Sequence, residues 1–242
     1  MQPLKVTFKL ASPLFMDSEY PVHLDALLAY AVVQDAENNG EDDCWARADE
    51  FLDGVLEKSH RTGESEPWVW KASKLFVQVS STVQFTNQIR KSDPEMYFDD
   101  MHSEQNPNGV WVTGFMKDGS ARKINPETFG INTASGQQRG YQWLAASRWV
   151  REVTAYAVGD LAAVEYYLKT HIRNLGKVGR NGFGRVSSIE VEPHACEDDW
   201  RLRVLPMGMT GKAGAVYAPV QACLRAPYWR KTDRVMAMEF VF

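Results

Sequence analysis

Residues 160–192 read "DLAAVEYYLKTHIRNLGKVGRNGFGRVSSIEVE" and predict a helix, a glycine-rich loop and a strand in succession. Apolar residues recur at helical spacing between positions 161 and 175. Asp160 is suited to cap this helix, because its carboxylate can accept a hydrogen bond from an N–H group of the first turn. Gly176 is expected to end the helix in the left-handed conformation. Residues 185–192 predict the strand that leaves the loop.

The loop itself, residues 174–186, holds four glycines, three cationic side chains and one aromatic side chain. It runs from a helix to a strand, whereas nucleotide-phosphate loops run from a strand to a helix, so that the helix N-terminus faces the anion. Here the helix dipole would present its negative end to an anion. The loop is therefore not a mononucleotide or dinucleotide fingerprint, in spite of its glycines.

Binding of a polyanion would have to come from cationic side chains, exposed backbone N–H groups and base stacking on Phe183, as in single-stranded RNA recognition. Phe183 lies between two glycines. It could stack a base, or it could anchor the loop on the preceding helix. The candidate RNA-binding residues are Arg173, Lys177, Arg180, Asn181, Gly182, Phe183, Gly184 and Arg185.

The strands and helices predicted outside this segment indicate an α+β fold. Residues 4–10 alternate apolar and polar side chains and predict a first strand, and a helix is expected from about Val22 onward. Residues 74–85 and 148–160 predict two further strands. The order strand, helix, inserted material, strand, helix, loop, strand is compatible with a ferredoxin-like βαββαβ core, the topology of RNA-recognition motifs.

We interpret residues 1–242 as one domain with an insertion at 40–142 and a β-rich extension at 194–242. The insertion begins as an acidic helical segment, and its part at 86–142 is polar and aperiodic. Loops this long are usually functional or disordered. That part is either a thumb-like element that becomes ordered in a complex or a mobile insertion without a role. Two alternating strands are predicted in the extension, within 199–208 and 229–242.

Charge is distributed unevenly along the chain. The net charge is −4, yet residues 1–66 carry 14 acidic and 5 basic side chains, and residues 139–185 carry 8 basic and 3 acidic ones. A phosphate-binding face needs local rather than global positive charge, because screening removes distant charges within about 10 Å. Neither a signal peptide nor an apolar run long enough for a membrane span is evident, and we expect a cytoplasmic protein.

Two motifs in this order resemble the RAMP proteins of CRISPR systems. They are the loop "GKVGRNGFGRV" (176–186) and the helix "VHLDALLAYA" (22–31), which follows a strand and an "SPL" turn. The size and the opening are most similar to the small subunit of type IV CRISPR effector complexes. The resemblance implies a non-catalytic protein that holds the 5′ handle of the CRISPR RNA and caps the 5′ end of the guide. It would abut the repeating backbone subunit and the large subunit, near the flanking motif of the target DNA.

The alternative is a RAMP endoribonuclease that processes CRISPR repeat RNA with His23 or His171 as a general acid or base. In the structural interpretation, His23 and Asp25 fix the start of the first helix by capping and local hydrogen bonds. His171 is expected on the exposed side of its helix, as an RNA contact or a solvated residue. The acidic runs at 41–43 and 197–199 lack the alternating oxygen ligands of a calcium loop, and no cofactor or metal is expected.

Overall fold

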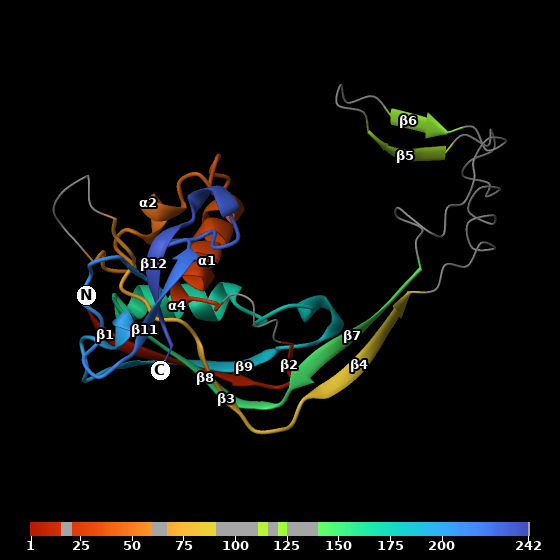
Figure 1. Ribbon diagram of the computed structural model, residues 1–242. Coiled ribbons are helices and arrows are strands. Elements are labelled where there is room, and N and C mark those ends of the chain that lie inside the picture. The colour runs from red at the N-terminus through yellow and green to blue at the C-terminus, as the bar shows by residue number, and fades with distance from the viewer. Residues whose placement is uncertain (16–20, 60–66, 91–110, 116–120, 125–139, 242) are drawn as a thin grey trace. The chain divides into compact units, whose positions relative to one another are not determined.

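The computed structural model describes residues 1–15, 21–59, 67–90, 111–115, 121–124 and 140–241 (Figure 1). The fold is α+β, with antiparallel sheets and the helices α1 (Leu24–Asn38), α2 (Ala48–Leu52) and α4 (Leu161–His171). By its internal contacts the chain divides into two units, Met1–Gln84 with Ala146–Phe242, and Phe85–Ala145. No helix among the described residues has both the length and the apolar character that crossing a membrane requires.

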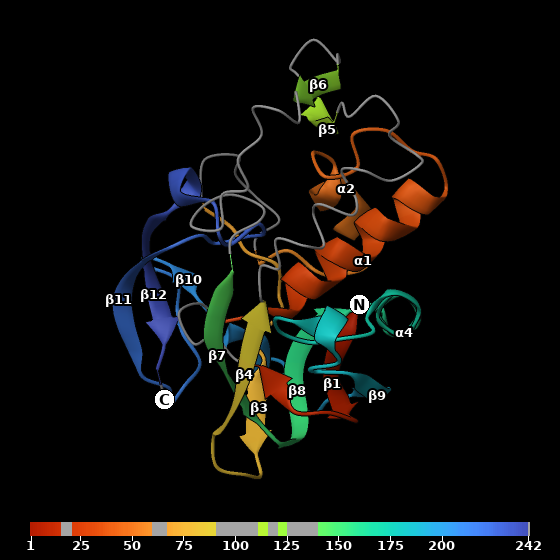
Figure 2. The same ribbon diagram turned by 90° about the vertical axis from the view of Figure 1, so that its right-hand side faces the viewer.

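The first unit is built on a four-stranded sheet in the order β3 (Phe76–Val79), β8 (Val150–Gly159), β1 (Gln2–Leu10), β9 (Val186–Pro193). All neighbouring strands are antiparallel. Along the chain, α1 lies between β1 and β3, and α4 lies between β8 and β9. Both helices cover the same face of the sheet (Figures 1 and 2). Their apolar residues share one core with the sheet, including Leu4, Val6, Phe8, Leu28, Val153, Ala155, Val164 and Leu168.

The predicted strands β1, β8 and β9 and the N-terminal cap of α4 are confirmed. The Asp160 carboxylate accepts a hydrogen bond from the Ala163 N–H at 2.8 Å. The predicted end of α4 is wrong, because the helix stops at His171. Residues 173–175 leave the helix to pair with residues 184–186, as in the hydrogen bond from the Leu175 N–H to the Gly184 carbonyl at 2.8 Å.

The single strand predicted at 74–85 is also wrong. The chain turns after β3 and continues as β4 (Gln84–Arg90). At this turn the Ser81 hydroxyl accepts a hydrogen bond from the Trp149 N–H at 2.9 Å, which fixes the break. A single strand would have placed Val79 and Phe85 on the same face, and they are 40% and 68% exposed.

The C-terminal residues form a small sheet in the order β10 (Leu205–Pro206), β12 (Val235–Phe240), β11 (Tyr217–Ala222). The strand predicted within 229–242 is confirmed as β12. The strand predicted within 199–208 is largely a 3-10 turn, Asp199–Arg201, followed by the two residues of β10. A second core cluster joins Val158 of β8 to Trp200 and Leu205.

Strands also occur where the sequence predicts only loop. They are β5 (Trp111–Phe115), which pairs with β6 (Ala121–Ile124), and β7 (Tyr141–Arg148), the middle strand of the sheet β2 (Leu14–Phe15), β7, β4. Much of 86–142 lies outside the described residues, so its ordering in a complex stays a prediction.

Candidate nucleic-acid interface

The glycine-rich loop is fixed to the turn that follows β1. The Gly184 N–H donates to the Pro13 carbonyl, the Arg185 N–H donates to the Ser12 hydroxyl, and the Ala11 N–H donates to the Arg185 carbonyl, each at 2.8 Å. The glycine-rich loop, one of the two motifs that carry the family resemblance, therefore meets the "SPL" turn that precedes the other motif along the chain.

Two of the glycines are required by this close approach. Gly176 and Gly184 have φ angles of +75° and +62°. A Cβ atom on Gly176 would lie 2.6 Å from the Phe15 carbonyl oxygen, and one on Gly184 would collide with the Leu175 carbonyl oxygen. Gly182 has a φ of +88° but no atom within 4 Å of its Cβ position. Gly184 thus permits the close backbone contact between the loop and residue 175. Gly182 lies at an open tip, where another molecule could approach the backbone.

Replacing Gly184 by alanine is expected to lower the free energy of unfolding by more than about 2 kcal/mol, since a left-handed residue and a backbone collision are combined. Gly182→Ala should cost only the conformational strain, about 1–2 kcal/mol. Urea denaturation of both variants measures the difference. Equal losses would show that the close approach at Gly184 does not matter.

The cationic side chains of the loop are exposed. Arg173, Lys177, Arg180 and Arg185 all lie at the surface. Within the described part of the chain, no carboxylate lies within ion-pairing distance of Arg173, Arg180 or Arg185. These three guanidinium groups can therefore attract phosphate without first breaking an internal ion pair.

The sheet face opposite the helices offers no such charge. Lys5 and Lys9 point from β1 to this face, and their ammonium groups lie 3.2 and 2.6 Å from the carboxylates of Glu192 and Glu190 on β9. Each cation is matched by an anion on the neighbouring strand. The loop is therefore a better candidate for a phosphate contact than Lys5 and Lys9 of β1.

Phe183 is half-buried, and its ring packs against that of Phe15 of β2. The ring centroids are 6.4 Å apart and the ring planes are inclined by 67°, an edge-to-face contact. The ring therefore helps to anchor the loop on β2. Base stacking on its remaining exposed surface stays a prediction.

His23 is buried and does not cap α1. It occupies the N-cap position without a side-chain hydrogen bond to the helix, so the capping interpretation is wrong. Its ring stacks on that of Tyr228, with centroids 4.4 Å apart and planes inclined by 15°. Burial, together with the positive charges of Arg203 and Lys74, lowers the pKa of His23 well below its ordinary value. The imidazole is thus neutral at physiological pH and a poor general acid.

Asp25 belongs to a buried network that sequence reasoning missed. Its Oδ2 atom accepts a hydrogen bond from the Tyr228 hydroxyl at 2.6 Å and lies 3.4 Å from Nη2 of Arg203. Arg203 is fully buried. Its guanidinium donates to the Tyr228 hydroxyl oxygen and to the carbonyl oxygens of Trp70, Ala72, Val204 and Leu224.

Acidification is expected to destabilise the protein through His23. Its pKa in the folded state lies well below the ordinary 6.5, so the unfolded chain takes up the proton first. The stability due to neutral His23 is complete above about pH 6.5 and falls by about 1.4 kcal/mol per pH unit below it, until the pKa of the folded state is reached.

Urea denaturation at pH 7.5 and pH 5.5 of the parent and of His23→Phe tests this expectation. The variant cannot take up a proton at this position and should lose less stability between the two pH values. Burial raises the pKa of Asp25, which acts in the opposite direction, but this contribution is common to both proteins. Equal losses in the two proteins would contradict the assignment.

His171 is not on the exposed side of α4, so that expectation is wrong. Its side chain is 9% exposed, and Nε2 lies 3.1 Å from Oδ1 of Asp35 on α1. The same Asp35 oxygen accepts a hydrogen bond from the Tyr166 hydroxyl at 3.2 Å. This face of α4 packs against α1, and His171 joins the two helices instead of facing solvent.

Comparison with known protein families gives one extensive match. The family described as "CRISPR type IV associated protein Csf3" matches residues 2–240, which is nearly the whole chain. No curated protein matches the sequence. The matched residues include both motifs of the resemblance, the helix at 22–31 and the glycine-rich loop at 176–186. The chain therefore belongs to the CRISPR type IV associated Csf3 family, whose members are RAMP-type subunits of type IV CRISPR systems.

Proposed function

We propose that this protein is a non-catalytic RNA-binding subunit of a type IV CRISPR ribonucleoprotein, which holds the 5′ handle of the CRISPR RNA and caps the backbone of the complex. Family membership supports a role in such a complex. The observation that carries the proposal is the set of exposed arginines, Arg173, Arg180 and Arg185, around a loop that backbone hydrogen bonds fix to the "SPL" turn. Fixed cations beside an open backbone suit a single strand of RNA.

We also propose that the first unit is a ferredoxin-like RAMP core. The strand order β3-β8-β1-β9, with all pairs antiparallel and with α1 and α4 on one face, supports this assignment. In a βαββαβ unit the first and third strands lie together at the centre, and here these are β1 and β8. The core places the glycine-rich loop between the second helix and the last strand, as the resemblance requires.

The partners in this proposal follow from the resemblance. They are the CRISPR RNA, the repeating backbone subunit and the large subunit, with target DNA near its flanking motif as a further contact. The CRISPR RNA is tested most directly. The full chain, purified from cells that express the other type IV subunits and a CRISPR array, is expected to retain a short RNA whose sequenced 5′ end is the repeat-derived handle. The proposal would be overturned if the assembled complex contains RNA but this chain does not protect the 5′ end of that RNA from nuclease.

The absence of catalysis is part of the proposal. His23 is buried and neutral, and His171 is held by Asp35, so neither side chain is placed as an exposed general acid or base. Incubation with repeat RNA is therefore expected to leave the RNA intact. Specific cleavage that disappears in His23→Phe or His171→Ala, in folded protein, would favour the endoribonuclease instead.

A further inference from the structure

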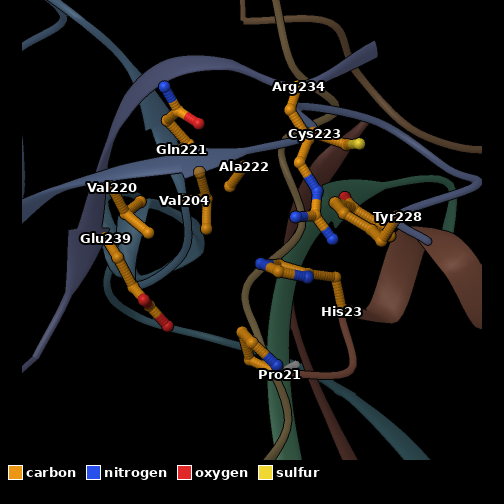
Figure 3. Close-up of a pocket in the computed structure, with 10 residues that line it drawn as sticks. All are labelled: Pro21, His23, Val204, Val220, Gln221, Ala222, Cys223, Tyr228, Arg234 and Glu239. Atoms are coloured by element: carbon orange, nitrogen blue, oxygen red, sulfur yellow. The ribbon is translucent and has the colours of Figure 1, made fainter. Parts of the chain in front are cut away.

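A pocket of about 80 Å³ lies beside His23, between the residues that lead into α1 and the strands β11 and β12 (Figure 3). Pro21, Val204, Val220 and Ala222 give it an apolar wall. Pockets for whole drug-sized ligands are several times larger, typically about 300–1,000 Å³. Only a small group, or one edge of a larger one, can enter it.

His23 offers unused hydrogen-bonding capacity in this pocket. It is 1% exposed, and within the described part of the chain neither Nδ1 nor Nε2 forms a well-aligned hydrogen bond, although the Pro21 backbone carbonyl is near enough to oppose slightly the lowering of the His23 pKa. A neutral imidazole carries one N–H donor and one acceptor nitrogen. Leaving both unsatisfied in a buried place is costly, so the site favours a guest that can donate and accept.

The opposite charges that line the pocket do not favour a phosphate as that guest. Arg234 and Glu239 line the pocket with opposite charges, and His23 is neutral. The interior is thus matched to an uncharged group with donors and acceptors side by side. The hydrogen-bonding edge of an unpaired nucleobase has this character.

The segment next to the pocket combines cations with an exposed aromatic ring. It is residues 223–234, "CLRAPYWRKTDR", here called the Trp229 loop. Tyr228 faces the pocket and stacks on His23, whereas Trp229 is 74% exposed. Arg230 and Lys231 follow it and are exposed as well, and Arg230 forms an exposed ion pair with Asp233 of the same loop at 3.3 Å. Exposed aromatic rings beside cations are the means by which proteins bind single strands without reading their full sequence.

We propose that the Trp229 loop and the pocket at His23 form a second contact with single-stranded RNA. Trp229 stacks one unpaired base, Arg230 and Lys231 contact its phosphates, and the edge of a neighbouring base enters the pocket. This inference rests on the proposed function for its ligand and uses none of the residues of the glycine-rich loop. Six peptide bonds join Phe15, on which that loop packs, to Pro21 of the pocket, so these two residues lie within about 20 Å. One strand can therefore reach both places.

Photo-cross-linking tests the placement directly. A short single-stranded RNA that contains 4-thiouridine is bound to the full chain and irradiated, and the attached peptides are identified by mass spectrometry. Cross-links are expected in the peptides that hold His23 and Trp229. The same RNA, labelled with a fluorophore, gives affinities by anisotropy at several salt concentrations.

Two variants and one matched control make the affinities interpretable. Trp229→Ala is expected to weaken binding roughly 5- to 100-fold with an unchanged salt slope, because a stacking contact and no charge is lost. Trp45→Ala removes another exposed tryptophan, 57% exposed, from the acidic part of the chain and should bind like the parent. His23→Phe keeps a ring against Tyr228 but removes both nitrogens, and several-fold weaker binding is expected in protein that remains folded.

The outcomes separate this inference from the proposed function. Cross-links confined to residues 174–186, with parental affinity in Trp229→Ala, would overturn the second contact and leave the first. A parent chain that binds no RNA would overturn both. Parental RNA affinity together with failure of Trp229→Ala to join the other subunits would show a protein-docking surface and overturn the inference. If free nucleosides at the same concentration as the RNA prevent the cross-link, the pocket is a nucleoside site. That result would also overturn the inference.

Discussion

Replacing Arg203 by methionine is expected to lower the free energy of unfolding by about 3–5 kcal/mol, the usual cost of breaking a buried ion pair from one side. The side chain has no exposed surface, and its guanidinium holds together segments that are far apart in sequence, at 70–72, at 204 and at 224–228. Methionine fills part of the volume but leaves buried carbonyl groups without the guanidinium donor and the Asp25 carboxylate without its opposite charge. Since domains of ordinary stability have about 5–15 kcal/mol in total, much of the protein should unfold near body temperature.

Urea denaturation monitored by tryptophan fluorescence measures this loss. Arg203→Lys should also be strongly destabilised, because an ammonium group cannot form the planar fork that reaches several carbonyls. Arg47→Met removes an arginine that pairs with Glu41 and Glu50 at the surface, and it should change little. In an Arg203→Met background, Asp25→Asn should cost less than in the parent. A loss below about 1 kcal/mol in Arg203→Met would contradict the role of the network.

Replacing Lys177, Arg180 and Arg185 together by alanine is expected to weaken RNA binding about 50-fold at 0.15 M salt, if each cation contacts one phosphate. The slope of log affinity against log salt concentration should fall by about 2, because three contacts with a single strand each release about 0.7 of a counterion. The fold should persist, since these side chains are exposed and the hydrogen bonds that fix the loop come from its backbone. Anisotropy titrations between 50 and 300 mM salt measure both quantities.

The matched control removes the same charge elsewhere. Lys5, Lys9 and Arg47 are surface cations that each pair with a carboxylate, and their joint replacement by alanine changes the net charge equally. This triple variant should keep the affinity and the salt slope of the parent. If the two triple variants lose affinity equally, the effect is one of overall charge, and the loop is not the phosphate site. Parental affinity in the loop variant would remove the loop as a candidate.

Local signals predicted the elements whose structure depends on local interactions. Asp160 caps α4 through a hydrogen bond within one turn, and the alternation in residues 4–10 follows from one face of β1 lying on the core. The other elements depend on contacts between residues that are far apart in the sequence. Residues 173–175 end α4 early because residues 184–186 offer strand-like partners, a contact that no helical pattern reveals. Pro219 argues against a strand at 217–222, yet β11 is an edge strand, where proline is tolerated.

The glycine-rich loop could be located from the sequence, but its surroundings could not. Glycines and cations close together in sequence indicate a loop that approaches a polyanion, and the structure describes the whole loop at the surface turn after β1. The burial of His23 and Arg203 could not be foreseen. Arg203 lies in the run "RLRVLP", where alternation places it on a polar face, and its partners come from other parts of the chain. The only local signal was a single arginine between two apolar residues.

The hydrogen bond between Ser12 and Arg185 spans 173 positions of the chain. Contacts of such long range form late in folding. Bringing the two residues together costs conformational entropy of the intervening chain, and this cost arises before the contact gives any stability. During synthesis, moreover, the hydrogen bonds between the turn after β1 and the loop cannot form until residue 185 has emerged from the ribosome. A nascent chain thus presents the cations of the loop on a fixed backbone only after both the turn that follows β1 and residues 184–185 have been synthesised. Under the proposed function, capture of RNA by this surface therefore follows the synthesis of residue 185.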